Sequence, residues 1–278
     1  MNRLAVIGQP IAHSRSPAIH NAAFAALGLQ DEWTYEAIEA SPREFAGLVR
    51  SLSERGFVGA NVTVPHKREA LRVADEASAA ASEIGAANTL SFARAAIRAD
   101  NTDGPGFLAA LPASPGDRRS LVLGAGGAAR AVVWALVREG ASVEIWNRTP
   151  ERARQLAAEL GAGLAQERRL GTEYRGPRTE DYDLIVNATS VGMDSPAPPN
   201  GVSDLKALCL DADGFRDRQV VVDLPYGVAE TELIRAARAH GASVVDGLEV
   251  LVRQGAESFR VWTGLDPPLD AMRRAARG

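Results

Sequence analysis

The stretch Leu121-Val-Leu-Gly-Ala-Gly-Gly-Ala-Ala-Arg130 decides the fold of this chain of 278 residues. An apolar strand at Leu121–Leu123 leads into a glycine-rich turn, and the pattern predicts a helix from this turn to about Glu139. A second strand is expected at Ser142–Trp146. This order of strand, turn, helix and strand is typical of the first part of a dinucleotide-binding domain.

Small residues in the turn suit the binding of a dinucleotide. Gly124 permits the tight passage from strand to helix, and Gly126 lets backbone N–H groups approach a pyrophosphate. Ala129 allows the helix to lie close to the strand, and the helix N-terminus stabilises phosphate charge. A merely structural glycine turn is the alternative. We expect cofactor contacts from the turn residues Gly124, Ala125, Gly126, Gly127 and Ala128.

The end of the second strand indicates which dinucleotide binds. Sites that prefer NAD usually carry Asp or Glu here to bind the ribose 2′-hydroxyl. This chain has Asn147, Arg148 and Thr149, with Arg152 one helical turn later. Arginine offers a planar, charged fork for a phosphate, so we predict NADP(H) as the cofactor. Alternatively, Arg148 is a surface residue and Thr149, before Pro150, caps a helix; Thr149 could serve both purposes.

Strand-like and helix-like segments alternate on both sides of the turn, which predicts an α/β fold with mainly parallel sheets. Before the turn we expect strands at 4–7, 33–38, 59–64 and 87–92, and helices at 16–27, 42–55 and 67–74. After it we expect strands at 184–188, 220–223 and 243–246, a flexible Pro-rich loop at 194–199 and a long helix at 248–264. Ser16 and Ser41 each precede a proline, a pattern typical of a helix N-cap.

A loop of Pro, Gly and small residues at Leu111–Asp117 precedes the glycine turn, so we divide the chain near residue 103. The expected domains are a substrate-binding and catalytic domain at 1–102, a Rossmann-type NADP-binding domain at 103–246 and a C-terminal helical segment at 247–278. The residues alone leave open which domain the last segment packs on.

Composition excludes several classes of function. The net charge is −4 without a basic block, so nucleic acid and acidic membrane surfaces are poor partners. The single cysteine, Cys209, excludes a disulfide within the chain and is expected to be a small buried hydrophobe. No signal segment or long apolar run is present, which favours the cytoplasm. The histidines form no metal-ligand motif, and we expect His13 and His20 to satisfy local hydrogen bonds.

The scarcity of lysine draws attention to Lys67. Of the 31 basic residues only Lys67 and Lys206 are lysines, so arginine supplies nearly all positive charge. An ammonium group can be tuned to release its proton, whereas a guanidinium stays charged. We therefore consider Lys67 a candidate for proton transfer. Alternatively, it is a solvated lysine at the start of a helix. Lys206 has no chemical neighbours in sequence and is expected at the surface.

Polar residues cluster where the predicted strands end, which is where open α/β sheets bind ligands. Each group has a structural alternative: Ser16 as a helix cap, Asn61 and Thr63 facing solvent, Asn88 in a turn, and Asp103 as a helix cap. Together they form a site of hydroxyls, amides, a carboxylate and one lysine. Such a site suits a small, polyhydroxylated, carboxylated substrate. The groups are His13–Ser16, Asn61–Lys67, Asn88-Thr89 and Asp100–Asp103.

Eight ordered motifs extend along the whole chain. They are Gly8-Gln-Pro-Ile-Ala-His-Ser-Arg-Ser-Pro17, Asn61-Val-Thr-Val-Pro-His-Lys67, Gly85-Ala-Ala-Asn-Thr89, Asp100-Asn-Thr-Asp103, Gly124-Ala-Gly-Gly-Ala128, Asn147-Arg-Thr149, Asn187-Ala-Thr-Ser190 and Gln254-Gly-Ala-Glu-Ser-Phe259. Together these motifs resemble those of the shikimate dehydrogenase family. The resemblance implies an enzyme that reversibly reduces 3-dehydroshikimate to shikimate with NADPH, for aromatic amino-acid biosynthesis, as a monomer or homodimer.

The same resemblance implies residue roles. Ser14 and Ser16 hold the substrate carboxylate, and Lys67 lies beside the reacting oxygen with Asp103 as its partner. The final helix returns to the first domain. The remaining substrate-binding residues are Asn61, Thr63, Asn88, Tyr226 and Gln254, and the remaining cofactor-binding residues are Thr189, Leu224 and Gly247. The chain departs from the usual family pattern at Gly227–Thr231, where many members have Asn-Pro, and at Leu248, where Met is common.

The chemistry follows from the reaction. Negative charge grows on the ketone oxygen as hydride arrives, so a cation or proton donor must meet it. Whether Lys67 donates the proton or mainly stabilises charge stays open. A quinate/shikimate dehydrogenase with relaxed substrate or NAD use is the main alternative, although the chain keeps both serines and has no acidic residue near Arg148. A nucleotide-sensing scaffold would be expected to lack Lys67 or Asp103, and a folate or amino-acid dehydrogenase would not need the serine pair with Asn88.

Overall fold

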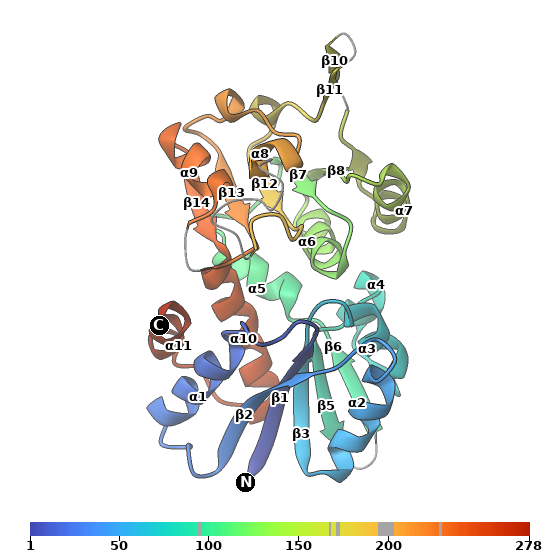
Figure 1. The fold of residues 1–278 in the computed structure, drawn as a ribbon, viewed down its shortest axis with the longest axis vertical. Coiled ribbons are helices and arrows are strands. Elements are labelled where there is room, and N and C mark those ends of the chain that lie inside the picture. Colours follow the sequence, from blue (N-terminus) through green and yellow to red (C-terminus); the bar gives the residue numbers. More distant parts are fainter. Residues whose placement is uncertain (94–95, 167, 171–172, 194–202, 228–229) are drawn as a thin grey trace. The chain divides into compact units, whose positions relative to one another are not determined.

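The chain forms two compact units in the computed structural model (Figure 1). The first unit contains Met1–Ala109 and Leu251–Gly278, and the second contains Ala110–Val250. The structure describes residues 1–93, 96–166, 168–170, 173–193, 203–227 and 230–278. The loop predicted at 194–199 and residues 228–229 lie outside the described part. No described helix is long and apolar enough to cross a membrane.

The first unit is built on a six-stranded sheet in the order β2-β1-β3-β5-β6-β4. β1 pairs in parallel with β2 and β3, whereas β5 runs antiparallel to both β3 and β6. The carboxyl ends of β1 and β3 therefore lie side by side, and this edge carries the polar motifs. The strands are β1 (Asn2–Gly8), β2 (Trp33–Glu39), β3 (Phe57–Val62), β4 (Glu76–Ala77), β5 (Thr89–Ala93) and β6 (Ala96–Asp100).

Helices cover this sheet through apolar faces. Phe45 and Val49 of α2 join Ala5 and Ile7 of β1 in one core cluster, because alternate strand residues point to the same face. Phe24 of α1 instead packs against the α10 ring of Phe259, and α1 and α11 lie side by side (Figure 1). The helices are α1 (Ser16–Ala26), α2 (Phe45–Glu54), α3 (Lys67–Val73), α4 (Ala79–Ile84), α5 (Asp103–Ala110), α10 (Gly247–Thr263) and α11 (Leu269–Arg277).

The predicted helix caps of the first unit are wrong. Ser16 is the first residue of α1 and does not cap it, since the helix follows Arg15, whose carbonyl accepts the N–H of Ile19. The Oγ of Ser14 instead accepts the N–H of Ser16 at 3.3 Å. At α2 the Ser41 hydroxyl donates to the Glu44 carboxylate at 2.5 Å, because a carboxylate is the stronger acceptor. The helix predicted at 42–55 begins three residues later, at Phe45.

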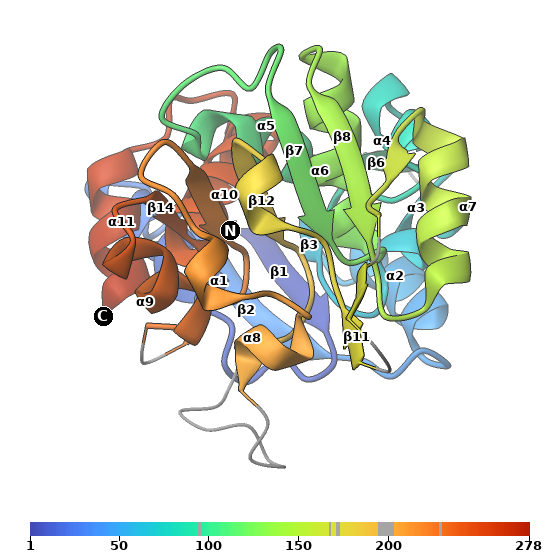
Figure 2. The same ribbon diagram turned by 90° about the horizontal axis from the view of Figure 1, so that it is seen from above.

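The second unit contains a six-stranded parallel sheet in the order β14-β13-β12-β7-β8-β9 (Figure 2). Continuous apolar runs form its central strands, as expected for strands buried on both faces. A short antiparallel pair, β10 with β11, lies outside this sheet. The strands are β7 (Arg119–Leu123), β8 (Ser142–Trp146), β9 (Gly163–Leu164), β10 (Arg168–Leu170), β11 (Glu173–Arg175), β12 (Leu184–Asn187), β13 (Val220–Asp223) and β14 (Ser243–Asp246).

Helices flank the parallel sheet and confirm the predicted Rossmann-type architecture. α6 packs on β7 and β8 as well as on α7, whereas α9 packs on β13 and β14. The chain leaves β7 toward β8 on one side, and β12 lies on the other side of β7. This reversal of strand order is where such sheets bind ligands. The helices are α6 (Gly127–Arg138), α7 (Pro150–Leu160), α8 (Asp204–Ala207) and α9 (Glu232–Ala239), with 3-10 turns at Thr179–Asp181 and Ala212–Gly214.

Candidate active site

An ion pair between Lys67 and Asp103 forms the centre of the polar site in the first unit. The Nζ of Lys67 lies 2.7 Å from Oδ2 of Asp103, and the two side chains are 13% and 16% exposed. Lys67 is the first residue of α3 and follows β3 by a short turn, while Asp103 is the first residue of α5. The structure thus joins two motifs separated by 36 positions. Lys67 is a paired lysine and not a solvated one.

Asn101 fixes the backbone from which Asp103 projects. Its Oδ1 accepts the N–H groups of Asp103 at 3.0 Å and Gly104 at 3.3 Å, and its Nδ2 donates to the carbonyl of Ala86. Asn101 therefore binds the first N–H groups of α5. The alternative interpretation of Asp103, as the cap of this helix, is thus not needed. The Asp103 carboxylate remains directed toward Lys67 and Asn88.

The amide of Asn88 links the ion pair to α10. Its Nδ2 lies 3.0 Å from Oδ1 of Asp103 and 3.1 Å from Oε1 of Gln254. Gly106 lets α10 come this close, since any larger residue there would place its Cβ 2.5 Å from the Gln254 backbone. Asn88 is buried, and Gln254 is 9% exposed. Predicted residues from three distant motifs thus meet in one hydrogen-bonded group.

The predicted hydroxyl residues lie near the carboxyl ends of β1 and β3. Ser14 is half-buried and Ser16 is buried in the first turn of α1. The N–H of Thr63 donates to the carbonyl of Ile7 at 2.9 Å, so Thr63 continues β3 beside the end of β1. A Cβ at Gly8 would lie 2.4 Å from the Thr63 methyl group, so this strand end needs glycine. These hydroxyls and the carboxyl ends of the two strands share one edge of the sheet.

Two hydroxyl residues of the site have no role assigned from the sequence, although Thr102 lies in the predicted polar group Asp100–Asp103 and Ser258 in the motif Gln254–Phe259. The side-chain oxygens of Thr102 and Ser258 lie 2.9 Å apart. Thr102 accepts a hydrogen bond from the Asn88 amide, and Ser258 accepts one from the Asn61 amide. Ser258 follows Gln254 by four residues, so one helical turn places both on the same face of α10. This four-residue spacing from Gln254 is the sequence signal that marks Ser258. Asn61 is 5% exposed and uses its amide on other protein groups.

The glycine turn of the second unit has the shape expected for a phosphate site. Gly124 adopts φ +112°, and a Cβ there would lie 3.0 Å from the Ala188 carbonyl oxygen, so glycine is required. Gly126 precedes α6 and has open space where a Cβ would project. Ala125, Gly127 and Ala128 are half-buried around the helix N-terminus, and Gly126 is exposed. The turn therefore leaves room for a ligand over the first N–H groups of α6.

Arg148 and Arg152 extend from the end of β8 and the start of α7. Both are exposed, and neither forms an ion pair with any residue in the described part of the chain. Asn147 donates from Nδ2 to the carbonyl of Thr149 at 2.9 Å, which shapes this loop. Thr149 occupies the N-cap position of α7, yet its side chain makes no capping bond, so the predicted cap is wrong in that respect. Pro150 occupies the first position of α7, where its missing N–H leaves no donor unpaired.

Thr189 and a buried carboxylate shape the end of β12. The Thr189 hydroxyl donates to Oδ1 of Asn187 at 2.7 Å, and Nδ2 of Asn187 donates to Oδ1 of Asp223 at 2.7 Å. The other oxygen of Asp223 accepts from the Thr231 hydroxyl at 2.5 Å. Burial raises the pKa of Asp223 to about 6, although the hydrogen bonds from Thr231 and Asn187 oppose the shift. Asp223 thereby ties together two loops at the carboxyl edge of this sheet.

The remaining predicted residues of the second unit follow β13 and β14. Leu224 is half-buried, and its N–H donates to the carbonyl of Asn187 at 3.0 Å. A Cβ at Gly247 would lie 2.3 Å from the Leu224 carbonyl oxygen, so only glycine fits at this start of α10. Tyr226 is half-buried three residues after β13.

Family models match three parts of the chain. Residues 6–90 match the shikimate dehydrogenase substrate binding domain, residues 111–193 match shikimate / quinate 5-dehydrogenase, and residues 247–277 match the shikimate 5′-dehydrogenase C-terminal domain. The NADP(+)-dependent shikimate dehydrogenase of Moorella thermoacetica is 41% identical over 99% of this chain and 92% of its own length. This chain belongs to the shikimate dehydrogenase family.

Other members resemble the chain as strongly. The NADP(+)-dependent shikimate dehydrogenase of Methanocella arvoryzae is 42% identical over 98% of this chain and 97% of its own length. A crystal structure of the Thermus thermophilus shikimate 5-dehydrogenase in complex with NADP(H) and shikimate aligns with a TM-score of 0.85 and 41% identity. That alignment covers 100% of this chain and 99% of the other.

His20 and Cys209 have structural roles in this chain. His20 has no hydrogen-bond partner among the described residues, so the prediction that it satisfies a local bond is wrong. It is buried and stacks on the Tyr35 ring at 4.3 Å, and burial lowers its pKa to about 3. Cys209 is half-buried. Within the described residues, no group of three or more potential metal ligands occurs.

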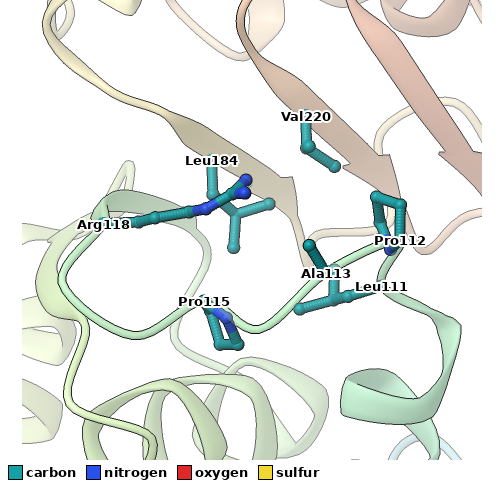
Figure 3. Close-up of a pocket in the computed structure, with 7 residues that line it drawn as sticks. All are labelled: Leu111, Pro112, Ala113, Pro115, Arg118, Leu184 and Val220. Carbon is teal, nitrogen blue, oxygen red and sulfur yellow. The ribbon is translucent and has the colours of Figure 1, made fainter.

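A small surface hollow in the second unit lies away from the predicted site residues (Figure 3). Leu184 and Val220 open β12 and β13, so the hollow is at the amino ends of these strands. Ligands of this fold bind at the carboxyl ends instead. We therefore assign the hollow no part in the activity. It is lined by Leu111, Pro112, Ala113, Pro115, Arg118, Leu184 and Val220.

Proposed function

We propose that the chain is an NADP-dependent shikimate dehydrogenase that reversibly reduces 3-dehydroshikimate to shikimate. The observation that carries this proposal is the Lys67–Asp103 ion pair, which places an ammonium group among amide and hydroxyl side chains. The named relatives, 41% and 42% identical along almost the whole chain, support the substrate and the cofactor.

Substrate binding is assigned to the polar side chains of the first unit. Ser14 and Ser16 would hold the carboxylate through their hydroxyl groups, since the serine hydroxyls can both donate to an anion. Thr63, Asn88 and Gln254 would bind the ring hydroxyls. Tyr226 of the second unit is proposed as a further substrate contact.

Lys67 and Asp103 are proposed to move the proton of the reaction. As the ketone is reduced, its carbon gains a hydride and its oxygen gains the proton that Lys67 releases. The ion pair with Asp103 holds the ammonium group in place before that transfer. In the oxidation of shikimate, Lys67 accepts the hydroxyl proton.

The second unit is proposed to bind NADP(H), which supplies or accepts the hydride when bound. Its turn Gly124–Ala128 would hold the pyrophosphate, and the open space at Gly126 fits this role. The exposed guanidinium groups of Arg148 and Arg152 would bind the 2′-phosphate. Asn147, Thr149, Thr189, Leu224 and Gly247 would complete the contacts.

An initial-rate assay with shikimate and quinate, each with NADP and NAD, tests the proposal. We expect rapid reduction of NADP with shikimate, and slow reduction in the other three combinations. Quinate or NAD activity of similar efficiency would instead assign the chain to quinate/shikimate dehydrogenases. No reduction in any combination would refute the proposed function. The cytoplasmic location and a monomeric or homodimeric state remain predictions, which cell fractionation and light scattering can check.

A further inference from the structure

Three buried hydroxyl groups meet behind the proposed catalytic pair. The side-chain oxygens of Thr89 and Thr102 lie 3.1 Å apart, those of Thr89 and Ser258 3.0 Å, and those of Thr102 and Ser258 2.9 Å. Thr89 and Ser258 are fully buried, and Thr102 is 4% exposed. We call these three residues the hydroxyl cluster. Such a buried group is rigid when every member has partners.

The backbone N–H of Thr102 determines which way the Asn88 amide points, and the hydroxyl cluster supports that orientation. Oδ1 of Asn88 accepts the backbone N–H of Thr102 at 2.7 Å, and a backbone N–H can only donate. The NH₂ group must therefore face Asp103, whose Oδ1 lies 3.0 Å away. The Thr89 hydroxyl lies 3.1 Å from the same Asn88 oxygen and supports this orientation.

Ser258 gives the cluster a fixed direction of hydrogen bonds. Its hydroxyl lies 3.1 Å from the Gln254 carbonyl, which can only accept, so Ser258 donates its single hydrogen there. The Ser258 oxygen is then left to accept from Thr102 at 2.9 Å and from Nδ2 of Asn61 at 2.8 Å. Thr102 in turn accepts from Nδ2 of Asn88 at 2.9 Å. A directed chain runs from Asn88 through Thr102 to Ser258.

Asn61 secures the cluster from the other side. Its Nδ2 also donates to the Asn88 carbonyl at 3.0 Å, and its Oδ1 accepts from the Tyr35 hydroxyl at 2.8 Å. Both amide ends are thus used within the protein, and the side chain is buried. Asn61 acts on the site by holding Asn88 and Ser258.

We propose that Ser258 is a positioning residue for the proposed dehydrogenase reaction, acting through Thr102 and Asn88 to hold the Asp103 carboxylate against Lys67. The inference rests on the proposed function, because the pair it positions is the proposed proton-transfer pair. Ser258 reaches neither Lys67 nor Asp103 directly in the hydrogen bonds of the described residues. Because Ser258 acts through Asn88, which is also a proposed substrate contact, its loss is expected to change turnover more than KM for shikimate.

Steady-state kinetics of shikimate oxidation test this role. Ser258→Ala and Thr102→Val each remove one hydroxyl, and we expect kcat to fall about five- to tenfold with KM for shikimate unchanged within about twofold. Thr102→Ser keeps the hydroxyl and should retain most of the turnover. The double variant should lose about as much as either single variant, because both break the same chain.

Val252→Ala separates positioning from general destabilisation. Val252 is buried on α10 outside the hydroxyl cluster, so its truncation should lower the melting temperature and leave kcat unchanged. Unchanged kcat in Ser258→Ala would overturn the proposal. The proposal would also be overturned if Ser258→Ala and Val252→Ala, compared at equal melting temperatures, lost the same kcat. An effect of Ser258→Ala on KM alone would overturn it as well.

A substrate-free measurement distinguishes failure of this inference from failure of the proposed function. The side-chain amide signals of Asn88 in a ¹H–¹⁵N spectrum, identified by their loss in Asn88→Asp, should move in Ser258→Ala and Thr102→Val but not in Val252→Ala. Absent shikimate turnover in the wild type with these shifts present would refute the function and support the positioning. Unmoved Asn88 signals would refute the positioning whatever the activity.

Discussion

The Lys67 ammonium and the Asp103 carboxylate meet at 2.7 Å although 36 positions separate them in the chain. Both side chains are largely buried, so each charge depends on the other for compensation. Asn88 donates to the second carboxylate oxygen and fixes its direction. The pair is therefore held in position before any substrate binds.

Replacing Asp103 by Asn should disable the pair. The amide is nearly isosteric but carries no charge, so Lys67 would lose its counter-ion and its fixed position. We expect kcat/KM for shikimate to fall about 10²-fold or more. Steady-state kinetics measure this change, and circular dichroism confirms that the variant is folded. A loss below about threefold would show that Asp103 has no important part in turnover.

Two glycine substitutions in one turn should separate cofactor binding from folding. Gly126 has φ −87° and open space around its Cβ position, so Gly126→Ala should fold as stably as the wild type but weaken NADP binding about tenfold or more. Gly124 has φ +112°, so Gly124→Ala should also lower stability by about 1–3 kcal/mol. Calorimetric titration with NADP and chemical unfolding provide the two readouts. Wild-type NADP affinity in Gly126→Ala would contradict the assigned pyrophosphate site.

Arg148→Ala should reduce the preference for NADP. Loss of a charge-assisted bond to the 2′-phosphate is expected to raise KM for NADP about tenfold while KM for NAD stays unchanged. Arg154→Ala is the matched control, because Arg154 lies on α7 and pairs with Glu151 at the surface. Comparable effects of both variants, or equal effects on NADP and NAD, would argue against a 2′-phosphate contact at Arg148.

His20 should make the fold sensitive to acid. Burial lowers its pKa from 6.5 to about 3, so the unfolded chain binds the proton more readily between these values. Stability from neutral His20 is complete above about pH 6.5 and falls toward pH 3, by up to about 1.4 kcal/mol per pH unit. His20→Phe should reduce this loss, as chemical unfolding at several pH values would show.

The pH comparison must be made between variants, because Asp223 acts in the opposite direction. Its pKa is raised from 3.8 to about 6, so its contribution to stability falls as pH rises through this range. His240→Gln is the control, since His240 is exposed. If His20→Phe and the wild type lose stability in parallel on acidification, His20 is not the group responsible.

Much of this architecture is readable from sequence. The glycine turn and the apolar strands around it predict the second unit because local geometry and burial act together there. The strands at Ser142–Trp146, Val220–Asp223 and Ser243–Asp246 agree with prediction to the residue. Lys67 stands out because arginine replaces lysine almost everywhere else. Lys206, the other lysine, is exposed as expected.

Other features depend on contacts that spacing does not reveal. Ser258 meets Thr89 across 169 positions, so spacing along the chain does not predict that these two hydroxyls meet. β6, which pairs antiparallel with β5, has charged residues at alternate positions and resembles a polar loop in sequence. The predicted N-cap at Ser16 is wrong, because the N-cap position of α1 is Arg15 and Ser16 is already the first residue of the helix.

The turnover of Lys67→Arg tests the central claim most directly. This variant keeps a positive charge near Asp103 but cannot release a proton at neutral pH. We expect kcat for shikimate oxidation to fall about 10²-fold or more, whereas Lys206→Arg at the surface should retain wild-type kcat. Near-normal turnover in Lys67→Arg would contradict proton transfer by Lys67 and leave it only a role in charge stabilisation.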